Sequence, residues 1–298
     1  MNDDRRQRLI GLGAEELADA LLKLAGRDEV ADDLVDRMIA NPAENIVRFK
    51  SKISELMSMS RFVPWGESTA FARELEDLLE RLGAGNPDPH TGAELVVAFY
   101  RTDEAVLNNC DDSNGRIGDV YRYDARNLFV SYASRCRNKE WLADLVLALN
   151  QEDHFGVRDS LIDCAGEYLP IQVIRGMIDR LCTLSDQERE EYGRRHRLLC
   201  IESLARQIKD APLFEKARLS AWEEPSTAAC VDIGRVYLES GDPRTALSWL
   251  ERIPLSETFQ AYERDRLLLE IYGKLGGREE QAKTAWRSRR KMYTRFRN

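Results

Sequence analysis

The stretch Ile233-Gly234-Arg235-Val236-Tyr237, followed by Gly241, Ala246 and Leu250, decides the fold of this chain. The same pattern recurs downstream, in Leu268, Leu269, Tyr272, Gly276, Ala282 and Trp286. Tyr237 and Tyr272 are 35 residues apart, and Leu250 and Trp286 are 36 apart. Self-similarity at a period of this length is the sequence signature of a repeat architecture. The two copies therefore predict two consecutive helix pairs.

The spacing of these residues resembles that of the tetratricopeptide repeat (TPR). In that pattern a small residue lets the second helix approach the first, an aromatic residue fills the groove between them, and a glycine turns the chain. Each pair leaves an apolar face that the next pair covers, so such units stack into a solenoid. The resemblance predicts TPR-like repeats at residues 227–260 and 262–296. An ordinary helical hairpin with coincident small and aromatic residues is the alternative.

Elsewhere the apolar residues also recur at helical spacing. Between residues 66 and 82 they line one face of a helix, with charged residues on the other, and they are Phe71, Leu75, Leu78, Leu79 and Leu82. The run Leu95-Val96-Val97-Ala98-Phe99-Tyr100 resembles a strand, but it has no hairpin partner nearby, so we expect a buried helix. The predicted fold is all-α, an α-solenoid of antiparallel helix pairs that is TPR-like at the C-terminus.

Composition divides these helices into three groups. A segment rich in glycine and proline, residues 83–89, follows an N-terminal helical cluster at residues 1–84. Residues 85–190 are predicted to form irregular helical repeats, and residues 191–298 the TPR-like repeats. We expect the three groups to form one continuous array.

Local signals mark several helix ends. Asp242-Pro243 places a capping side chain before a proline at the first helical position. Ser185-Asp186-Gln187-Glu188 has the form of a capping box, which predicts a helix start. Three glycines each follow an apolar stripe, where a left-handed residue would end a helix, and they are Gly83, Gly241 and Gly276.

Four short motifs carry a further resemblance. They are Leu12-Gly13-Ala14-Glu15-Glu16-Leu17-Ala18, Phe62-Val63-Pro64-Trp65, Asp111-Asp112-Ser113-Asn114-Gly115-Arg116-Ile117-Gly118-Asp119-Val120 and Asp153-His154-Phe155-Gly156-Val157-Arg158-Asp159. They resemble an uncharacterised bacterial family of all-helical, TPR-like proteins, and the region that follows SWIM-type zinc fingers in longer bacterial proteins. The resemblance implies a helical fold and a bacterial cytoplasmic setting, and it implies no activity. The Cys and His ligands of a SWIM finger are absent, so its zinc chemistry is not carried over.

Charge and cysteine content exclude several classes. The 298 residues carry a net charge of −8, opposite to that of a global nucleic-acid or anionic-membrane binder. No stretch approaches the roughly 20 apolar residues that span a bilayer, and the N-terminal residues show no apolar run of a secretion signal. None of the six cysteines forms a C-x-x-C pair, so we expect reduced, buried thiols in a cytoplasmic protein.

Two polar clusters invite a metal hypothesis. Asp111-Asp112-Ser113-Asn114-Gly115 fails the EF-hand template, because the loop would begin at Cys110 and end at Tyr121, and neither supplies a carboxylate. We expect helix caps there instead. The Asp153-His154 loop, with Glu152 and Asp159, needs further ligands from another helix to bind a metal, so we expect a solvated loop. The sequence predicts no catalytic residue, no metal ligand and no cofactor.

The C-terminal segment is strongly basic. Residues 281–298 hold seven basic residues and no acid, and the densest patch is Arg287, Arg289, Arg290 and Lys291. Interleaved aromatic residues there are typical of nucleic-acid contacts. The favoured interpretation is a terminal helix of the array, whose arginines pair with the acidic body and complement the helix dipole.

The leading functional hypothesis is a non-enzymatic helical-repeat scaffold that binds a protein or peptide partner. In the TPR pattern the groove-facing positions of the first helices correspond to Val231, Arg235, Leu238, Arg266 and Glu270. Arg235 and Arg266 would contact a carboxylate of the partner, or pair with acids of this chain. Nucleic-acid association through residues 281–298 is the alternative function. A hydrolase or metal-dependent enzyme around Asp153-His154 is a third hypothesis.

Overall fold

The fold is described from a computed structural model, which covers residues 2–28, 31–32, 35, 42–85, 87–221, 225–278, 280–281 and 283–284. The chain divides into two compact units. Unit 1 comprises Met1–Cys136 and His154–Arg158, and unit 2 comprises Arg137–Asp153 and Asp159–Asn298. The first unit is therefore discontinuous in sequence. The division into residues 1–84, 85–190 and 191–298 stays a prediction.

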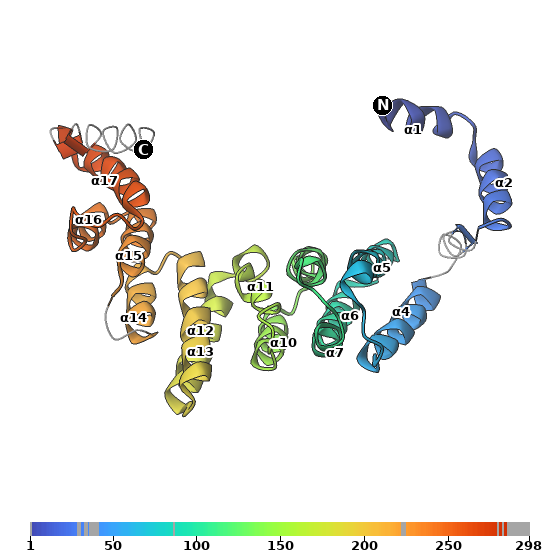
Figure 1. The fold of residues 1–298 in the computed structure, drawn as a ribbon, viewed down its shortest axis with the longest axis horizontal. Helices are drawn as coiled ribbons and strands as arrows, with labels where there is room; N and C mark the ends of the chain where they lie inside the picture. Colours follow the sequence, from blue (N-terminus) through green and yellow to red (C-terminus); the bar gives the residue numbers. More distant parts are fainter. Residues whose placement is uncertain are drawn as a thin grey trace. The chain divides into compact units, whose positions relative to one another are not determined.

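Every regular element among these residues is helical, which confirms the predicted all-α class (Figure 1). The helices of unit 1 are α1 (Asn2–Ile10), α2 (Ala14–Ala25), α4 (Pro42–Met57), α5 (Trp65–Ala84), α6 (Pro89–Tyr100), α7 (Asp103–Asn108), α8 (Arg116–Asp119), the π-helix η1 (Val120–Ala125) and α9 (Arg126–Ala133). An isolated β-bridge joins Val63 and Cys110. Among the helices described, none combines the length and apolar character that crossing a membrane requires.

The core of unit 1 forms where α6 packs on α9. The strand-like run 95–100 is helical, as predicted, and Val96, Val97, Phe99 and Tyr100 are fully buried. A Cβ at Gly92 would lie only 2.5 Å from the Tyr132 ring, so the two helices approach most closely where α6 has no side chain.

A buried ion pair lies within the same unit. Arg158 donates from Nε and Nη2 to the two carboxylate oxygens of Asp103, over 2.8 and 2.7 Å. The side chains are 4% and 1% exposed. Beside them the hydroxyls of Thr102 and Tyr121 are hydrogen-bonded over 2.8 Å. The pair holds the segment His154–Arg158 against α7, the helix that Asp103 begins.

Unit 2 is built from helices that pack on their neighbours along the chain. Its elements are α10 (Lys139–Gln151), α11 (Asp159–Ile162), the 3-10 helix η2 (Ala165–Glu167), α12 (Ile171–Gln187), α13 (Glu191–Gln207), α14 (Ala211–Ala221), α15 (Thr227–Glu239), α16 (Pro243–Glu251) and α17 (Ala261–Leu275). The closest packing joins α13 to α12 and to α14, and α15 to α16. Most contacts are therefore short-range in sequence.

Residues of the first repeat copy meet where α15 and α16 approach. Ala246 is fully buried, and a Cβ at Gly234 would lie 3.0 Å from Leu250 and 3.3 Å from the Ala246 carbonyl oxygen. In the second copy Leu268 is buried and Tyr272 packs against the same core. Ala282 and Trp286, the remaining members of that copy, lie outside the described residues.

The predicted helix ends are partly confirmed. The Asp242 side chain accepts from the Thr245 amide at the start of α16, and Gly241 and Gly276 have left-handed φ angles of 93° and 76°. The predicted start at Ser185 is wrong, because α12 continues to Gln187 and buries Ser185 on its inner face. The predicted end at Gly83 is also wrong, since α5 continues to Ala84.

Candidate functional site

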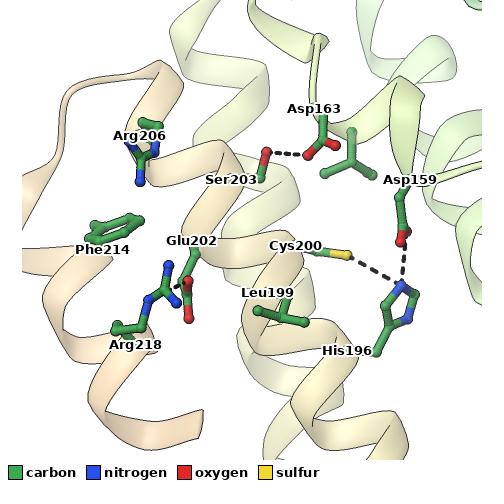
Figure 2. Close-up of a pocket in the computed structure, with 11 residues that line it drawn as sticks. Asp159, Asp163, His196, Leu199, Cys200, Glu202, Ser203, Arg206, Phe214 and Arg218 are labelled. Carbon is green, nitrogen blue, oxygen red and sulfur yellow. Dashed lines mark hydrogen bonds and ion pairs between the residues drawn. The ribbon is translucent and has the colours of Figure 1, made fainter. Parts of the chain in front are cut away.

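A pocket of about 480 Å³ opens in unit 2 between α11, α13 and α14 (Figure 2). One half of its wall carries Asp159, His196 and Cys200. The other half carries Glu202 and Arg218. Such a concave site with convergent polar groups is the default candidate for binding.

The first half is a cluster of three different donor groups. His196 and Cys200 are four residues apart on α13, so they share one face of that helix. Asp159 begins α11, and its Oδ1 lies 2.8 Å from His196 Nε2. Cys200 Sγ lies 4.0 Å from the same nitrogen. Carboxylate, imidazole and thiol thus converge on one point in the wall of the pocket.

Asn150, near the end of α10, supports this cluster from behind. Its Nδ2 donates to Asp159 Oδ1 over 2.7 Å, and its Oδ1 accepts from the Cys200 thiol over 3.6 Å. The residue is 4% exposed. One buried amide therefore fixes both the carboxylate and the sulfur.

The protonation states in the cluster argue against a cysteine nucleophile. The hydrogen bond to the Asp159 carboxylate raises the pKa of His196 to about 11, so the imidazole is protonated at neutral pH. Burial raises the pKa of Cys200 above its ordinary value. Reactive cysteines need the opposite shift. His196 also presents a single nitrogen to both neighbours, whereas a catalytic triad uses one ring nitrogen for the nucleophile and the other for the acid.

The second half of the pocket contains a buried carboxylate, that of Glu202. Burial raises the pKa of Glu202 to about 7, and its Oε1 has no hydrogen-bond partner among the described residues. Arg218 Nε lies 2.8 Å from the other oxygen, Oε2. The Phe214 ring packs beneath the guanidinium groups of Arg206 and Arg218, at 4.9 and 5.4 Å.

From this point a row of alternating charges crosses α13, α14, α15 and α17. Its successive members are Glu202, Arg218, Asp232, Arg235, Glu263 and Arg266, joined over 2.8, 3.4, 3.7, 2.9 and 2.7 Å. We call these six residues the charge row. It connects the pocket to the face of α15 and α17 for which the sequence predicted partner binding.

The structure places the predicted partner-binding residues in two environments. Val231 and Leu238 are buried in the core of unit 2, so their side chains offer no surface to a partner. Arg235 and Arg266 both pair with Glu263, as the intramolecular alternative predicted, and Glu270 pairs with Lys274. The basic patch of Arg287, Arg289, Arg290 and Lys291 lies outside the described residues.

The two polar clusters singled out in the sequence differ in outcome. In the Asp111–Gly115 loop, Asp112 accepts from the amides of Ile117 and Gly118, each over 2.8 Å, which confirms the capping role. For the Asp153-His154 loop, the sequence predicted that a metal site would need further ligands from another helix. Next to Asp159, the structure places His196 and Cys200 of α13 in that position. Their spacing on a helix was a readable signal, but their proximity to Asp159 depends on how α11 packs against α13.

The comparisons with known proteins bear on residues 5–218, which match the model of a family of unknown function, DUF6880. The match contains the whole pocket and ends before the repeat copies at residues 227–260 and 262–296. The searches of curated proteins and of solved structures found no match. Because the family model covers well over half of the sequence, the chain belongs to the DUF6880 family of unknown function.

Proposed function

We propose that this chain is a non-enzymatic helical-repeat scaffold that binds a protein or peptide partner. The observation that carries the proposal is the charged face on α15 and α17, where Arg235 and Arg266 converge on Glu263 over 2.9 and 2.7 Å. In a TPR-like array these helices would be the first helices of consecutive repeats. Their outward positions then form one surface, on which a partner would bind.

The arrangement of the helices supports a solenoid of this kind. Repeat arrays are held by contacts between neighbouring units. In unit 2, α14, α15 and α16 each pack on the next helix in the chain. Gly234 and Ala246 lie at the close approach of α15 and α16, where the TPR pattern requires small residues. We therefore propose a TPR-like solenoid for this part of the chain.

The chemistry of the charged face favours an acidic group on the partner. Two guanidinium groups share the single carboxylate of Glu263, and the Arg266 side chain is 50% exposed. Arginine pairs with carboxylates through two parallel hydrogen bonds. A carboxylate of the partner can therefore join Glu263 at the two guanidinium groups, where the incoming charge is paired.

The setting proposed for this binding is the bacterial cytoplasm. All six cysteines are free thiols, and five of them are buried, as expected of a chain folded in a reducing compartment. The likeness to the region that follows SWIM-type zinc fingers stays part of the proposal.

The test is affinity capture from native cell extract with charge-reversal variants as bait. Arg266→Glu places a third acid beside Glu263 and Glu270, so it should abolish recovery of the partner. Arg244→Glu makes the same charge change on α16, at an exposed position, and should recover the partner like the unaltered chain. Circular dichroism checks that both variants keep their helix content. Equal recovery with both baits, or recovery of nucleic acid alone, would contradict the proposal.

A further inference from the structure

We propose that Asp159, His196 and Cys200 form a binding site for a divalent transition-metal ion, with Zn²⁺ as the natural occupant. The site would have three protein ligands and a fourth position that faces the pocket. This inference is independent of the partner-binding proposal, because it concerns the other end of the charge row.

The donor set fits zinc. Thiolate, imidazole and carboxylate are the three ligand types that zinc sites in proteins use. Soft thiolate ligands select against Mg²⁺ and Ca²⁺, which prefer sites made of oxygen alone. Three protein ligands with one open position are typical of zinc sites that also hold water or a bound molecule.

The geometry fits as well. The three ligand atoms all lie within 4.8 Å of one another. Zinc lies about 2.0–2.1 Å from nitrogen or oxygen and about 2.3 Å from sulfur, so ligand atoms in a tetrahedral site are roughly 3.3–3.6 Å apart. The Asp159–His196 distance of 2.8 Å must lengthen slightly and the Cys200–His196 distance of 4.0 Å must shorten slightly. Both changes are of the size that side-chain rotation supplies.

The charge of the ion is matched by its ligands. Zinc binds the deprotonated ligand forms, here a neutral imidazole, a thiolate and a carboxylate. Their two negative charges equal the charge of a divalent ion, so the occupied site is neutral.

The surroundings hold the ligands in place. Asn150 Nδ2 donates to Asp159 Oδ1 over 2.7 Å from a buried position, which is the outer-shell support that metal-binding carboxylates require. The bond from the Cys200 thiol to Asn150 is lost with the thiol proton. His196 and Cys200, one helical turn apart on α13, need no movement of the backbone to share an ion.

The experiment is a titration of the purified, chelator-treated full-length chain with Co²⁺, followed by displacement with Zn²⁺. We expect one equivalent of Co²⁺ to bind, with a thiolate-to-cobalt charge-transfer band and the intense visible bands of tetrahedral coordination. Zn²⁺ should remove both sets of bands, and Mg²⁺ should not. Absence of the charge-transfer band in the unaltered chain would overturn the proposal.

Matched variants separate the site from the other thiols. Cys200→Ser should remove the charge-transfer band, whereas Cys182→Ser, which alters a partly exposed thiol in the same unit, should leave it unchanged. His196→Ala should weaken Zn²⁺ binding by at least about 100-fold, because loss of an outer-shell group alone costs about 10- to 100-fold. A band that survives in Cys200→Ser would overturn the assignment.

A measurement on the unaltered chain covers the case in which a variant fails to fold. Zn²⁺ should slow alkylation of Cys200 relative to Cys182, as read by peptide mass spectrometry after limited labelling. It should also release protons into weakly buffered solution, because zinc ligands must be deprotonated to bind the ion. If the labelling of Cys200 relative to Cys182 is the same with and without Zn²⁺, the proposed site is contradicted.

Discussion

Two polar clusters of this chain, one in each unit, differ in how far their charged side chains are exposed to solvent. In unit 1, Asp103 and Arg158 are 1% and 4% exposed and satisfy each other through two hydrogen bonds. In unit 2, Asp159 and His196 are 34% and 25% exposed and line a pocket. The first pair is closed off from solvent, whereas the second faces a pocket, where we propose that an ion binds.

The two clusters also contain residues that are adjacent in the sequence. Arg158 ends the short segment that belongs to unit 1, and Asp159 begins the helix α11 of unit 2. Removing one partner of a buried ion pair is strongly destabilising, because it leaves an uncompensated buried charge. The closed pair should therefore dominate effects on stability, and the open cluster should dominate effects on binding.

The largest effect on stability is expected from Arg158→Met. The variant leaves Asp103 buried without its partner, so the free energy of unfolding should fall by about 3–5 kcal/mol. The measurement is denaturation in urea, followed by circular dichroism. Arg175→Met is the control, because the Arg175–Asp210 pair, whose arginine side chain is 56% exposed, should contribute less than about 1 kcal/mol. Similar losses in both variants would remove the distinction between closed and exposed pairs.

A smaller loss of stability is expected from overpacking a contact between two helices that involves no charged groups. In unit 1, Gly92→Ala would place a methyl group 2.5–2.6 Å from three atoms of the buried Tyr132 ring, whose hydroxyl is fixed by a 3.0 Å bond to the Leu82 carbonyl. Overpacking of this kind costs about 1–3 kcal/mol. Gly176→Ala on α12 is the control, because no atom outside its own stretch of helix backbone lies within 4 Å of the added carbon. It should gain about 0.5–1 kcal/mol from helix propensity. Thermal unfolding should thus shift in opposite directions.

The corresponding test in unit 2 is Ala246→Leu. Ala246 is fully buried between α15 and α16, so a larger side chain must push the helices apart at a cost of about 1–3 kcal/mol. Glu251→Ala, at an exposed position of the same helix, should leave the melting temperature nearly unchanged. A lower melting temperature in Ala246→Leu but not in Glu251→Ala would show that α15 and α16 are tightly packed, although the same unit contains an open pocket. Equal, negligible shifts would remove the TPR-like alignment.

The sequence predicted features of the fold that depend on nearby residues. Helical periodicity identified the run at residues 95–100 as a helix, and the proline after Asp242 identified the start of α16. Local signals failed where packing overrode them. Ser185 has the form of a capping residue, but it lies on the buried side of α12, and the helix continues past it.

The polar clusters could not be predicted, because their members are distant in sequence. Asp103 and Arg158 are 55 residues apart, and Asp159 and His196 are 37 apart. The spacing of His196 and Cys200 predicts one shared helix face, but no pattern in the sequence tells which acid that face meets. The TPR pattern likewise placed Val231 and Leu238 in a groove, whereas the packing of α15 buries both. Those contacts follow from tertiary packing alone.

The smallest effect is expected from an exposed carboxylate, Asp242 at the start of α16. Its side chain accepts from the hydroxyl and the amide of Thr245, and these bonds lower its pKa below the ordinary value of 3.8. The carboxylate therefore stabilises the fold at pH values above 3.8, and the stabilisation is lost as the pH falls through the lowered pKa.

Replacement of a capping residue by alanine costs about 0.5–2 kcal/mol, so Asp242→Ala should cost that much at pH 7 and less in acid. The measurement is the difference in unfolding free energy between the variant and the unaltered chain at several pH values, with Glu251→Ala as the control on the same helix. A difference that grows on acidification would contradict the role of Asp242.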